Sequence, residues 1–254
     1  MSMTYPQDER TLATLEQLKE AIRTHNRIVV LSGAGISVPS GIPDFRSAHG
    51  LYSTKYGNFN AEEIISHDFF LSHVDVFYEF YKSKMLYPSA KPNAMHFLLA
   101  RLEREGKISL VITQNIDGLH QEAGNKRVCE LHGSVHRNHC ERCGKFFDLN
   151  YITASTGTPV CDDCGGIIKP DVVLYGEMLN NKDLNNAVRA LSQADMLIVI
   201  GTSLVVYPAA GLCEYFDGDT TAVINKSATY MDAKADILIN DDCALVAEWL
   251  DKNL

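Results

Sequence analysis

The sequence predicts an α/β fold, a doubly wound parallel sheet of the Rossmann-like kind with a smaller lobe attached. Short apolar, β-branched runs recur along the chain, as buried parallel strands do. They lie at 28–31, 109–113, 196–200, 221–224 and 237–239. Segments with helical character alternate with these runs, at 11–25, 93–105, 183–193 and 243–252. Alternating strands and helices indicate a parallel sheet with helices on both faces.

The first helix and strand lead into a glycine turn. Helix 11–25 has one apolar stripe that should pack on the sheet, formed by Leu12, Leu15, Leu18 and Ile22. The run 28–31 then stops at Gly33-Ala34-Gly35. A glycine turn at the carboxyl end of a strand is where such sheets bring backbone N–H groups to a pyrophosphate. A plain tight turn is the alternative, because the dehydrogenase fingerprint asks for a third glycine where Val38 stands.

Two regions interrupt the alternation of strands and helices. Residues 41–91 are aromatic-rich and read as a helical insertion, and residues 133–170 hold paired cysteines. We expect both to form the smaller lobe of one catalytic domain, 1–254. The large lobe would then comprise approximately 1–40, 92–132 and 171–254.

Composition and charge exclude several classes of protein. The 254 residues are 46% hydrophobic, enough for a substantial core. Lys+Arg minus Asp+Glu is 23 − 32 = −9, and the charges are scattered, which argues against nucleic acid as a partner. We expect no membrane partner, since no apolar stretch is long enough to span a bilayer. The N-terminus MSMTYPQDER lacks a secretory pattern, so we expect a cytoplasmic protein.

Four of the seven cysteines form two close pairs, Cys140/Cys143 and Cys161/Cys164. Two Cys-x-x-Cys pairs at this separation favour one tetrahedral zinc ion in a ribbon-like module. Four thiolates leave no open coordination position, so the metal would be structural. Replacement of one ligand by His136 or His139, a redox-active pair and a nucleic-acid-binding ribbon are the alternatives.

Two polar motifs follow predicted strands. Gln114-Asn115-Ile116-Asp117 comes directly after run 109–113, at the edge where doubly wound sheets bind ligands. A turn that caps a helix is the other interpretation of this segment. His132 follows another short strand and precedes a glycine. An imidazole that titrates near neutral pH can accept and return a proton.

Together these motifs resemble the sirtuin family, in a minimal, bacterial-type catalytic core. The run GAGISVPSGIPDFR from Gly33 to Arg46 matches the family almost residue for residue, although Val38-Pro39 replace its small or acidic residues. The family also has TQNID and LHG where this chain has residues 113–117 and 131–133. The resemblance extends to Cys243 and implies NAD as a consumed co-substrate beside the structural Zn²⁺.

The resemblance also implies roles for individual residues. The loop residues that would face the phosphates and a flat ring are Gly33, Ala34, Gly35, Asp44, Phe45 and Arg46. Ile116 and Asp117 would hold the nicotinamide carboxamide. Gln114 and Asn115 would contact the adjacent ribose, and His132 would be the general base. The resemblance implies that Asn115 and Asp117, like His132, are catalytic residues.

The C-terminal half would complete the cofactor site and bind the peptide. Thr202 and Ser203 would meet phosphate or ribose, Asn225 the adenosine ribose and Cys243 the adenine edge. As alternatives, Thr202-Ser203 is a helix cap and Cys243 an ordinary buried thiol. Segments 169–177 and 201–208 would clamp an extended peptide as an added strand. The substrate contacts would be Val172, Val173, Leu174, Tyr175 and Val206; the family often has phenylalanine at the position of Tyr175.

The implied reaction is NAD-dependent removal of acetyl groups from protein lysines, so acetylated-lysine proteins or peptides are the expected partners. The acetyl oxygen attacks the ribose, nicotinamide leaves, and water completes release of free lysine and O-acetyl-ADP-ribose. Relatives that prefer succinyl-lysine carry a tyrosine and, three residues later, an arginine. Here Tyr78 is followed by Tyr81, which favours a neutral acyl group.

Two other functions fit parts of the same pattern. A protein mono-ADP-ribosyltransferase shares the first step but needs no base such as His132. A non-catalytic acetyl-lysine or NAD-binding module would keep the cleft without turnover. The oligomeric state stays open, with a monomer as one option.

Overall fold

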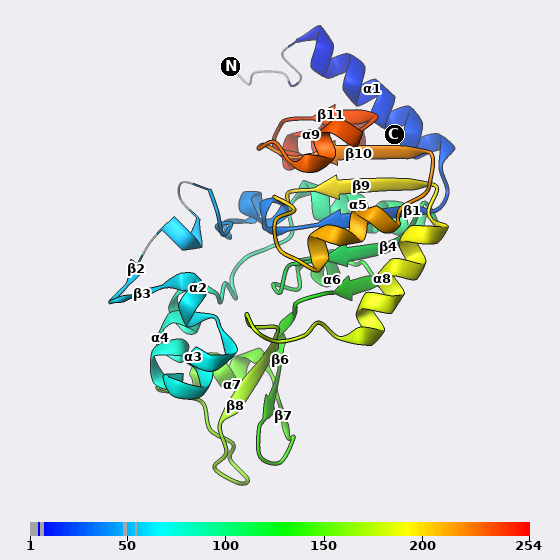
Figure 1. Cartoon of the computed structure of the whole chain (residues 1–254). Coiled ribbons are helices and arrows are strands. Elements are labelled where there is room, and N and C mark those ends of the chain that lie inside the picture. Colours follow the sequence, from blue (N-terminus) through cyan, green and yellow to red (C-terminus); the bar gives the residue numbers. More distant parts are fainter. Residues whose placement is uncertain (1–4, 6–7, 48–49, 54) are drawn as a thin grey trace.

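A six-stranded parallel sheet lies at the centre of the larger part of the molecule (Figure 1). The computed structural model describes residues 5, 8–47, 50–53 and 55–254. Residues 1–4 and 6–7 of the expected large lobe, and residues 48–49 and 54 of the expected helical insertion, lie outside the described residues. The strand order is β11-β10-β9-β1-β4-β5, and every neighbouring pair is parallel. The strands are β1 (Ile28–Ser32), β4 (Ile108–Thr113), β5 (Val128–Glu130), β9 (Met196–Ile200), β10 (Thr220–Ile224) and β11 (Ile237–Ile239).

Helices cover both faces of the sheet, which confirms the predicted doubly wound α/β fold. Alternate residues of β1 point to opposite faces, so Ile28 and Val30 join one core cluster while Val29 and Leu31 join another. The first face carries α1 (Glu9–Thr24), α5 (Ala94–Arg104) and α9 (Cys243–Asn253). The second carries α8 (Asn181–Gln193) and the 3₁₀ helix η3 (Ala209–Tyr215).

Helix α1 corrects one detail of the predicted apolar stripe. Leu15, Leu18 and Ile22 are buried against the sheet and neighbouring helices, as expected. Leu12, one turn earlier, is 41% exposed. The N-terminal turn of α1 therefore extends beyond the core. It is held instead by the Asp8 carboxylate, which accepts a hydrogen bond from the Thr11 N–H at 2.8 Å.

The two insertions lie together below the sheet and share one core cluster (Figure 1). Residues 41–91 contain the 3₁₀ helix η2 (Leu51–Ser53), the hairpin β2 (Lys55–Tyr56) and β3 (Phe59–Asn60), and helices α2 (Ala61–Ile64), α3 (His67–Ser72) and α4 (Val74–Lys84). The cysteine-containing region forms β6 (Gly133–Cys140), β7 (Phe146–Phe147), α7 (Leu149–Ala154) and β8 (Ile168–Val172). Phe77 and Tyr81 from α4 pack in the same cluster as Ile152 and Ile168.

The boundaries between the expected lobes stay a prediction. Strand β8 runs through the expected boundary at 170/171, because it pairs with β6 as far as Val172. In the described part of the chain, no helix has both the length and the apolar character needed to cross a membrane.

Candidate active site

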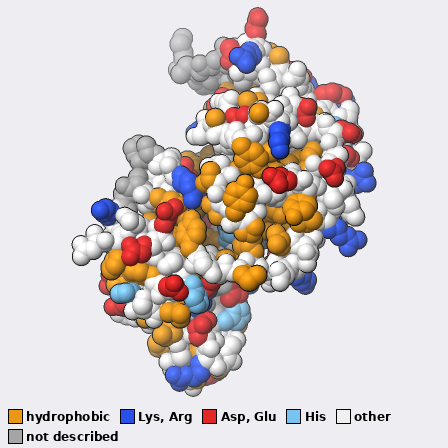
Figure 2. Space-filling model, in the orientation of Figure 1, with side chains coloured by type: hydrophobic (Ala, Val, Ile, Leu, Met, Phe, Trp, Pro, Cys, Tyr) orange, Lys and Arg blue, Asp and Glu red, His pale blue; other side chains and the backbone are white. Residues whose placement is uncertain are grey.

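A cleft of about 970 Å³ opens between the sheet and the insertions. Figure 2 shows hydrophobic side chains gathered around the hollow between the two parts of the molecule. The segments that follow β1, β4 and β9 all contribute to its lining. From β1 the sheet grows through β4 and β5 in one direction and through β9, β10 and β11 in the other. The cleft thus lies at the topological switch point, where doubly wound sheets bind nucleotides.

The glycine turn after β1 packs directly against the turn after β9. A side chain on Gly33 would place its Cβ 2.7 Å from the Thr202 Cβ, and one on Gly35 would lie 2.6 Å from the Gly201 Cα. The Gly33 N–H donates to the Ile200 carbonyl at 3.0 Å, and the Gly35 N–H donates to Gly201 at 2.7 Å. These two amides are therefore used by the sheet. The glycines serve to bring the backbone of two strand ends together at the cleft.

The segment after β4 is held by a chain of hydrogen bonds through Ser37. The Asn115 Nδ2 donates to the Ser37 Oγ at 3.0 Å, and that hydroxyl donates to the Asp117 Oδ2 at 2.7 Å. The Asp117 Oδ1 accepts from the Leu119 N–H, which starts α6 (Leu119–Ala123). The helix-cap interpretation of this segment is therefore correct in part. Burial raises the pKa of Asp117, although the bonds from Leu119 and Ser37 oppose it.

His132 lies between β5 and β6 and is fixed by the same segment. Its Nδ1 lies 2.9 Å from the Gln114 carbonyl oxygen, which can only accept. The neutral ring therefore carries its proton on Nδ1, and Nε2 keeps a free lone pair. Burial lowers the pKa of His132, while the bond to Gln114 acts in the opposite direction. The side chain lines the cleft as an uncharged imidazole.

Gln114 joins two strand ends. Its carbonyl orients His132, and its Nε2 donates to the Thr202 Oγ1 at 2.9 Å. Thr202 Oγ1 also accepts from the Leu204 N–H at 3.2 Å, so this residue caps a local turn as well as lining the cleft. Leu204, in that turn, has a backbone φ of 53°, which residues other than glycine rarely adopt.

The far end of the cleft is formed by β10 and α9. Asn225 follows β10, and its Nδ2 donates to the Ser227 carbonyl at 2.6 Å. Cys243 is the first residue of α9, and its thiol lies 3.9 Å from the Gly35 carbonyl oxygen. This thiol is buried, in agreement with the alternative that it is an ordinary packing residue. Its backbone still places the N-terminus of α9 at the cleft.

The segment that follows β8 forms the opposite wall. The Val173 N–H donates to the His132 carbonyl at 3.0 Å, so this wall is tied to the histidine through the backbone. Phe45 and Arg46 face it from the loop after the glycine turn. Arg46 makes a 3.6 Å ion pair with Glu62, and the Phe45 ring lies 5.4 Å from that of Tyr52.

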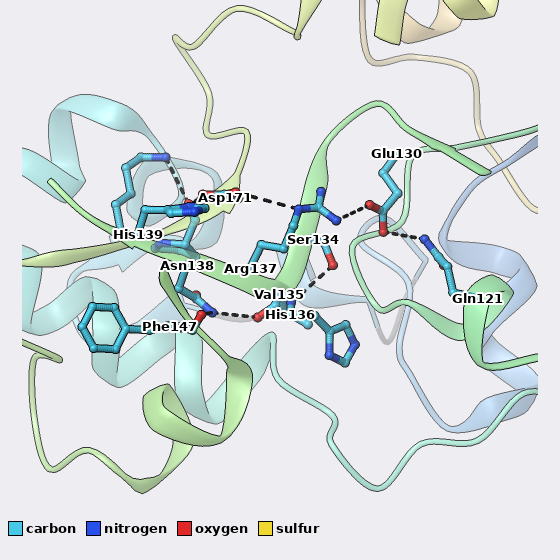
Figure 3. Close-up of polar contacts among 12 residues, drawn as sticks. Gln121, Glu130, Ser134, Val135, His136, Arg137, Asn138, His139, Phe147 and Asp171 are labelled. Carbon is cyan, nitrogen blue, oxygen red and sulfur yellow. Dashed lines mark hydrogen bonds and ion pairs between the residues drawn. The ribbon is translucent and has the colours of Figure 1, made fainter. Parts of the chain in front are cut away.

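A polar network joins the edge of the sheet to the cysteine-containing strands (Figure 3). The Glu130 carboxylate, at the end of β5, accepts from Gln121 at 2.8 Å and from Arg137 on β6 at 2.6 Å. Arg137 also lies 3.8 Å from Asp171 on β8, which pairs with His139 at 2.7 Å. The network flanks both His132 and the segment after β8, and therefore restrains their relative positions.

The four paired cysteines fit one structural zinc ion. Their Sγ atoms all lie within 4.8 Å of one another, with 3.4 Å between Cys140 and Cys164 and 3.6 Å between Cys143 and Cys161. Tetrahedral zinc with bonds of about 2.3 Å places its sulfurs about 3.8 Å apart. His136 and His139 bond to the Asp117 carbonyl and the Asp171 carboxylate instead, which leaves the four thiolates as the ligand set.

One cleft brings together every residue expected at the cofactor and peptide sites. The predicted residues in its lining are Gly33, Ala34, Gly35, Asp44, Phe45, Arg46, Gln114, Asn115, Ile116, Asp117, His132, Val172, Val173, Leu174, Tyr175, Thr202, Ser203, Val206, Asn225 and Cys243. The sequence analysis did not identify Ser37, although it lies inside the motif that runs from Gly33 to Arg46. It also missed Lys84, Met85 and Tyr87, since nothing in their pattern distinguishes them from other insertion residues.

The tyrosines compared with the succinyl motif lie outside this lining. Tyr78 and Tyr81 are buried among the aromatic rings of α4, with Tyr81 stacked on Phe77 at 5.5 Å. The Tyr78 hydroxyl donates to the Ile168 carbonyl of β8. Both side chains pack the core of the insertions, so they give no direct information about the acyl group.

Sequence comparison finds close relatives among bacterial proteins. The chain is 54% identical over 240 residues to an NAD-dependent protein deacetylase of Clostridium acetobutylicum, covering 93% of this chain and 98% of that protein. It is 56% identical over 230 residues to the NAD-dependent protein deacetylase of Clostridium tetani, covering 90% and 93%.

Structure comparison gives the same result. A Sir2 structure with a deacetylated p53 peptide and 3′-O-acetyl ADP ribose matches at a TM-score of 0.87 and 40% identity, covering 94% of this chain and 98% of that one. A complex of Sir2 with p53 peptide and NAD⁺ matches at 0.84 and 41% identity, with the same coverage. The family model for the Sir2 family matches residues 33–208. The glycine turn, His132 and the four-cysteine module thus lie in a chain that belongs to the Sir2 family.

Proposed function

We propose that this protein is an NAD-dependent protein-lysine deacetylase that converts NAD, acetyl-lysine and water into nicotinamide, O-acetyl-ADP-ribose and free lysine. The observation that carries this proposal is the orientation of His132, whose Nε2 is available as a base in a cleft that the glycine turn also lines. The relatives named above as deacetylases, and the Sir2 complexes with NAD⁺ and peptide, support it.

The glycine turn and the ends of β9 and β10 are the proposed NAD site. Gly33 and Gly35 let the turn after β1 pack against the turn after β9, so that both turns line the proposed nucleotide site. When bound, NAD supplies an electrophilic ribose carbon and nicotinamide as a leaving group. The apolar side chains of Phe45 and Ile116 help to exclude water from the ring side of the cleft.

His132 is the proposed general base. Its Nε2 takes a proton from a ribose hydroxyl, while Nδ1 keeps its hydrogen bond to the Gln114 carbonyl and so holds the ring in orientation. Asn115 and Asp117 bond to Ser37 rather than to each other, and we assign them to shaping the segment that receives the carboxamide and ribose. The remaining cofactor contacts predicted from the sequence are part of this proposal.

The proposed partners are proteins or peptides that carry acetyl-lysine. The Sir2 neighbours include a complex described as bound to acetylated peptide. In this chain, the segment that follows β8 and the segment around Val206 both line the cleft and would pair with the peptide backbone. We also propose a reducing, cytoplasmic location, because a four-thiolate zinc site is stable where cysteines stay reduced.

Product analysis tests the reaction. Wild-type protein, NAD and an acetylated peptide should yield O-acetyl-ADP-ribose and peptide that is lighter by one acetyl group, detected by mass spectrometry. Peptide or protein that gains ADP-ribose would identify the mono-ADP-ribosyltransferase instead. Binding of both ligands without any nicotinamide release would identify a non-catalytic module.

A second comparison tests the acyl preference. We propose that the site favours a neutral acyl group, acetyl first, because apolar Phe45, Ile116 and Leu174 line the cleft. The same peptide carrying acetyl- or succinyl-lysine should be deacylated faster in the acetyl form. Faster removal of succinyl would contradict this preference.

A further inference from the structure

The glycine turn continues into a 3₁₀ helix, η1 (Ala34–Ser40), which carries Ser37. Ser37 is buried, and its hydroxyl links Asn115 to Asp117. The proposed function assigns these two residues to the segment that receives the nicotinamide carboxamide and the ribose. The position of η1 therefore affects the shape of that segment through a single hydroxyl group.

A proline inside η1 leaves one of its carbonyls without the usual partner. In a 3₁₀ helix each carbonyl accepts from the N–H three residues later, so the Ile36 carbonyl would accept from residue 39. That residue is Pro39, which has no N–H. The Ile36 carbonyl belongs to the same peptide group as the Ser37 nitrogen. A group that binds this carbonyl therefore also fixes the backbone at Ser37.

Asn93 supplies a donor to this carbonyl from outside η1. Its Nδ2 donates to the Ile36 carbonyl at 2.8 Å and to the Ser40 hydroxyl oxygen at 2.8 Å. A side-chain amide has two N–H donors, so both are used. Ile36 and Ser40 lie on either side of Pro39 in the sequence. One side chain thus spans the part of η1 that the proline interrupts.

The direction of the Asn93 side chain is fixed by helix α5. Asn93 is the N-cap of α5: its Oδ1 accepts from the Met95 N–H at 3.0 Å, and its own N–H donates to the His96 Nδ1 at 3.3 Å. Because the oxygen of the amide is held by an N–H donor, the nitrogen faces η1. Asn93 therefore has two separate tasks, since its oxygen caps α5 and its nitrogen holds η1.

We propose that the Asn93 amide nitrogen positions the nicotinamide end of the cofactor site, through the Ile36 carbonyl and Ser37. This inference rests on the proposed function, which supplies NAD. Asn93 lies outside the lining of the cleft, so it is a positioning residue and not a catalytic one. Its loss should weaken the hold on the carboxamide more than the hold on the phosphates, which the glycine turn before Ile36 receives.

Asn93→Asp separates the two tasks. Aspartate is as good an N-cap as asparagine and keeps the acceptor oxygen, but it cannot donate to the Ile36 carbonyl. The KM for NAD and the inhibition constant of nicotinamide in a deacetylation assay should both rise by about three- to tenfold, the size expected for one hydrogen bond. The Kd of ADP-ribose, which lacks nicotinamide, should change by less than about twofold in calorimetry.

Two further variants make the result specific. Asn180→Asp is the matched control, because it makes the same chemical change at the N-cap of α8, where the side chain accepts from the Lys182 N–H at 2.8 Å. It should leave all three constants as in the wild type. Asn93→Ser keeps a good N-cap without adding a charge, but serine is too short to replace the amide. It should weaken nicotinamide binding as Asn93→Asp does.

Pro39→Ala tests the route through the Ile36 carbonyl. Alanine restores an N–H at position 39 that can donate to this carbonyl within η1. In the Pro39→Ala background, Asn93→Asp should therefore raise the inhibition constant of nicotinamide by less than about twofold. An equal rise with and without Pro39 would overturn this route.

The remaining outcomes separate this inference from the proposed function. Wild-type constants for NAD and nicotinamide in Asn93→Asp overturn the inference even if deacetylation is normal. An equal loss of ADP-ribose affinity, or the same changes in Asn180→Asp, overturns it as well. Wild-type protein that fails to deacetylate the peptide at all would instead overturn the proposed function.

Discussion

The hydrogen bond from His132 to the Gln114 carbonyl decides which ring nitrogen can act as a base. A carbonyl oxygen can only accept a hydrogen bond, so the neutral ring carries its proton on Nδ1 and has a lone pair on Nε2. Gln114 follows β4, whereas His132 follows β5, the neighbouring strand of the sheet. The tautomer is therefore set by the ends of two adjacent, hydrogen-bonded strands.

Replacement of His132 should separate binding from chemistry. His132→Ala removes the base but leaves the glycine turn and the end of β9 in place. We expect kcat/KM for deacetylation to fall by about 100- to 10,000-fold, the contribution typical of general-base catalysis. The affinity for ADP-ribose, measured by calorimetry, should change by less than about threefold. A variant that retains a tenth of wild-type activity would contradict the role of His132.

The pH dependence of the reaction should follow the state of His132. Burial lowers its pKa below the ordinary value of 6.5, and only the neutral form can take a proton. Activity should therefore be retained as pH falls through 6.5 and be lost only at lower pH. The acid limb of log(kcat/KM) against pH reports this ionisation in the free enzyme. A midpoint above 6.5 would be inconsistent with the buried histidine.

At the scale of elements, the four-cysteine module supports the active site from a distance. Cys140 and Cys161 are buried in the core that the module shares with the helical insertion. Strand β6 carries the first cysteine at its end and begins at Gly133, next to His132. We therefore expect a change in the module to affect the proposed base through this strand.

Loss of one zinc ligand should lower the activity of the enzyme, although no residue that lines the cleft is changed. Cys161→Ser should abolish stoichiometric zinc binding, lower the Tm and reduce kcat/KM by at least about tenfold. Metal analysis, calorimetry and a deacetylation assay measure the three effects. Cys129→Ala is the control, because this buried thiol bonds to the Asp183 carbonyl and lies outside the cluster. Equal zinc content in wild type and Cys161→Ser would exclude the proposed ligand set.

The strands of the sheet could be predicted because they are short, continuous apolar runs, and its helices because their apolar residues recur at helical spacing. Predicted run 196–200 coincides with β9, and run 237–239 with β11. The helical insertion has no comparable period: its aromatic residues are buried on several sides of short helices, as at Phe77, Tyr78 and Tyr81. Tyr78, for example, donates from its hydroxyl to the Ile168 carbonyl of β8, 90 residues further along the chain, and local spacing cannot predict such a contact.

In the candidate site, too, some features could be predicted from the sequence and others could not. Residues inside contiguous motifs, such as Gly33 to Arg46, were found because the motif itself identified them. The bond from Gln114 to Thr202 and the contact of Tyr175 with Tyr52 join residues more than 80 positions apart. Such pairs are determined by strand order and by the packing of the insertions, and a single sequence contains no direct signal for either.

At the scale of the whole molecule, two buried histidines make stability depend on pH. His96 on α5 and His120 on α6 lie with their rings 5.0 Å apart behind the cleft. The His120 Nε2 lies 2.9 Å from the Ser32 hydroxyl at the end of β1. Burial lowers the pKa of His96 to about 3 and that of His120 to about 4. The native state therefore holds both rings neutral.

Acid should destabilise the fold through this pair. Below pH 6.5 the unfolded chain binds protons at both histidines while the native state does not, so stability falls as pH falls towards 4. As pH falls from 6.5 to 5, each histidine should lower the free energy of unfolding by about 2 kcal/mol. Urea unfolding at several pH values should give a flatter profile for His96→Gln.

A matched variant distinguishes titration from simple loss of packing. Leu99→Ala, on the same helix, removes a buried side chain without a titratable group. It should lower the free energy of unfolding by about 2–5 kcal/mol at every pH while keeping the wild-type pH slope. If His96→Gln and Leu99→Ala gave the same slope, the buried pair would not be the source of the acid sensitivity.

The most direct test is to determine two crystal structures. One is the His132→Ala variant with NAD and an acetyl-lysine peptide bound, and the other is the wild type with ADP-ribose bound. We expect the nucleotide to lie along the ends of β1, β4 and β9, with a ribose hydroxyl within hydrogen-bond reach of the wild-type His132 Nε2. A nucleotide bound elsewhere, or a wild-type His132 turned away from the ribose, would contradict the proposed function at its central step.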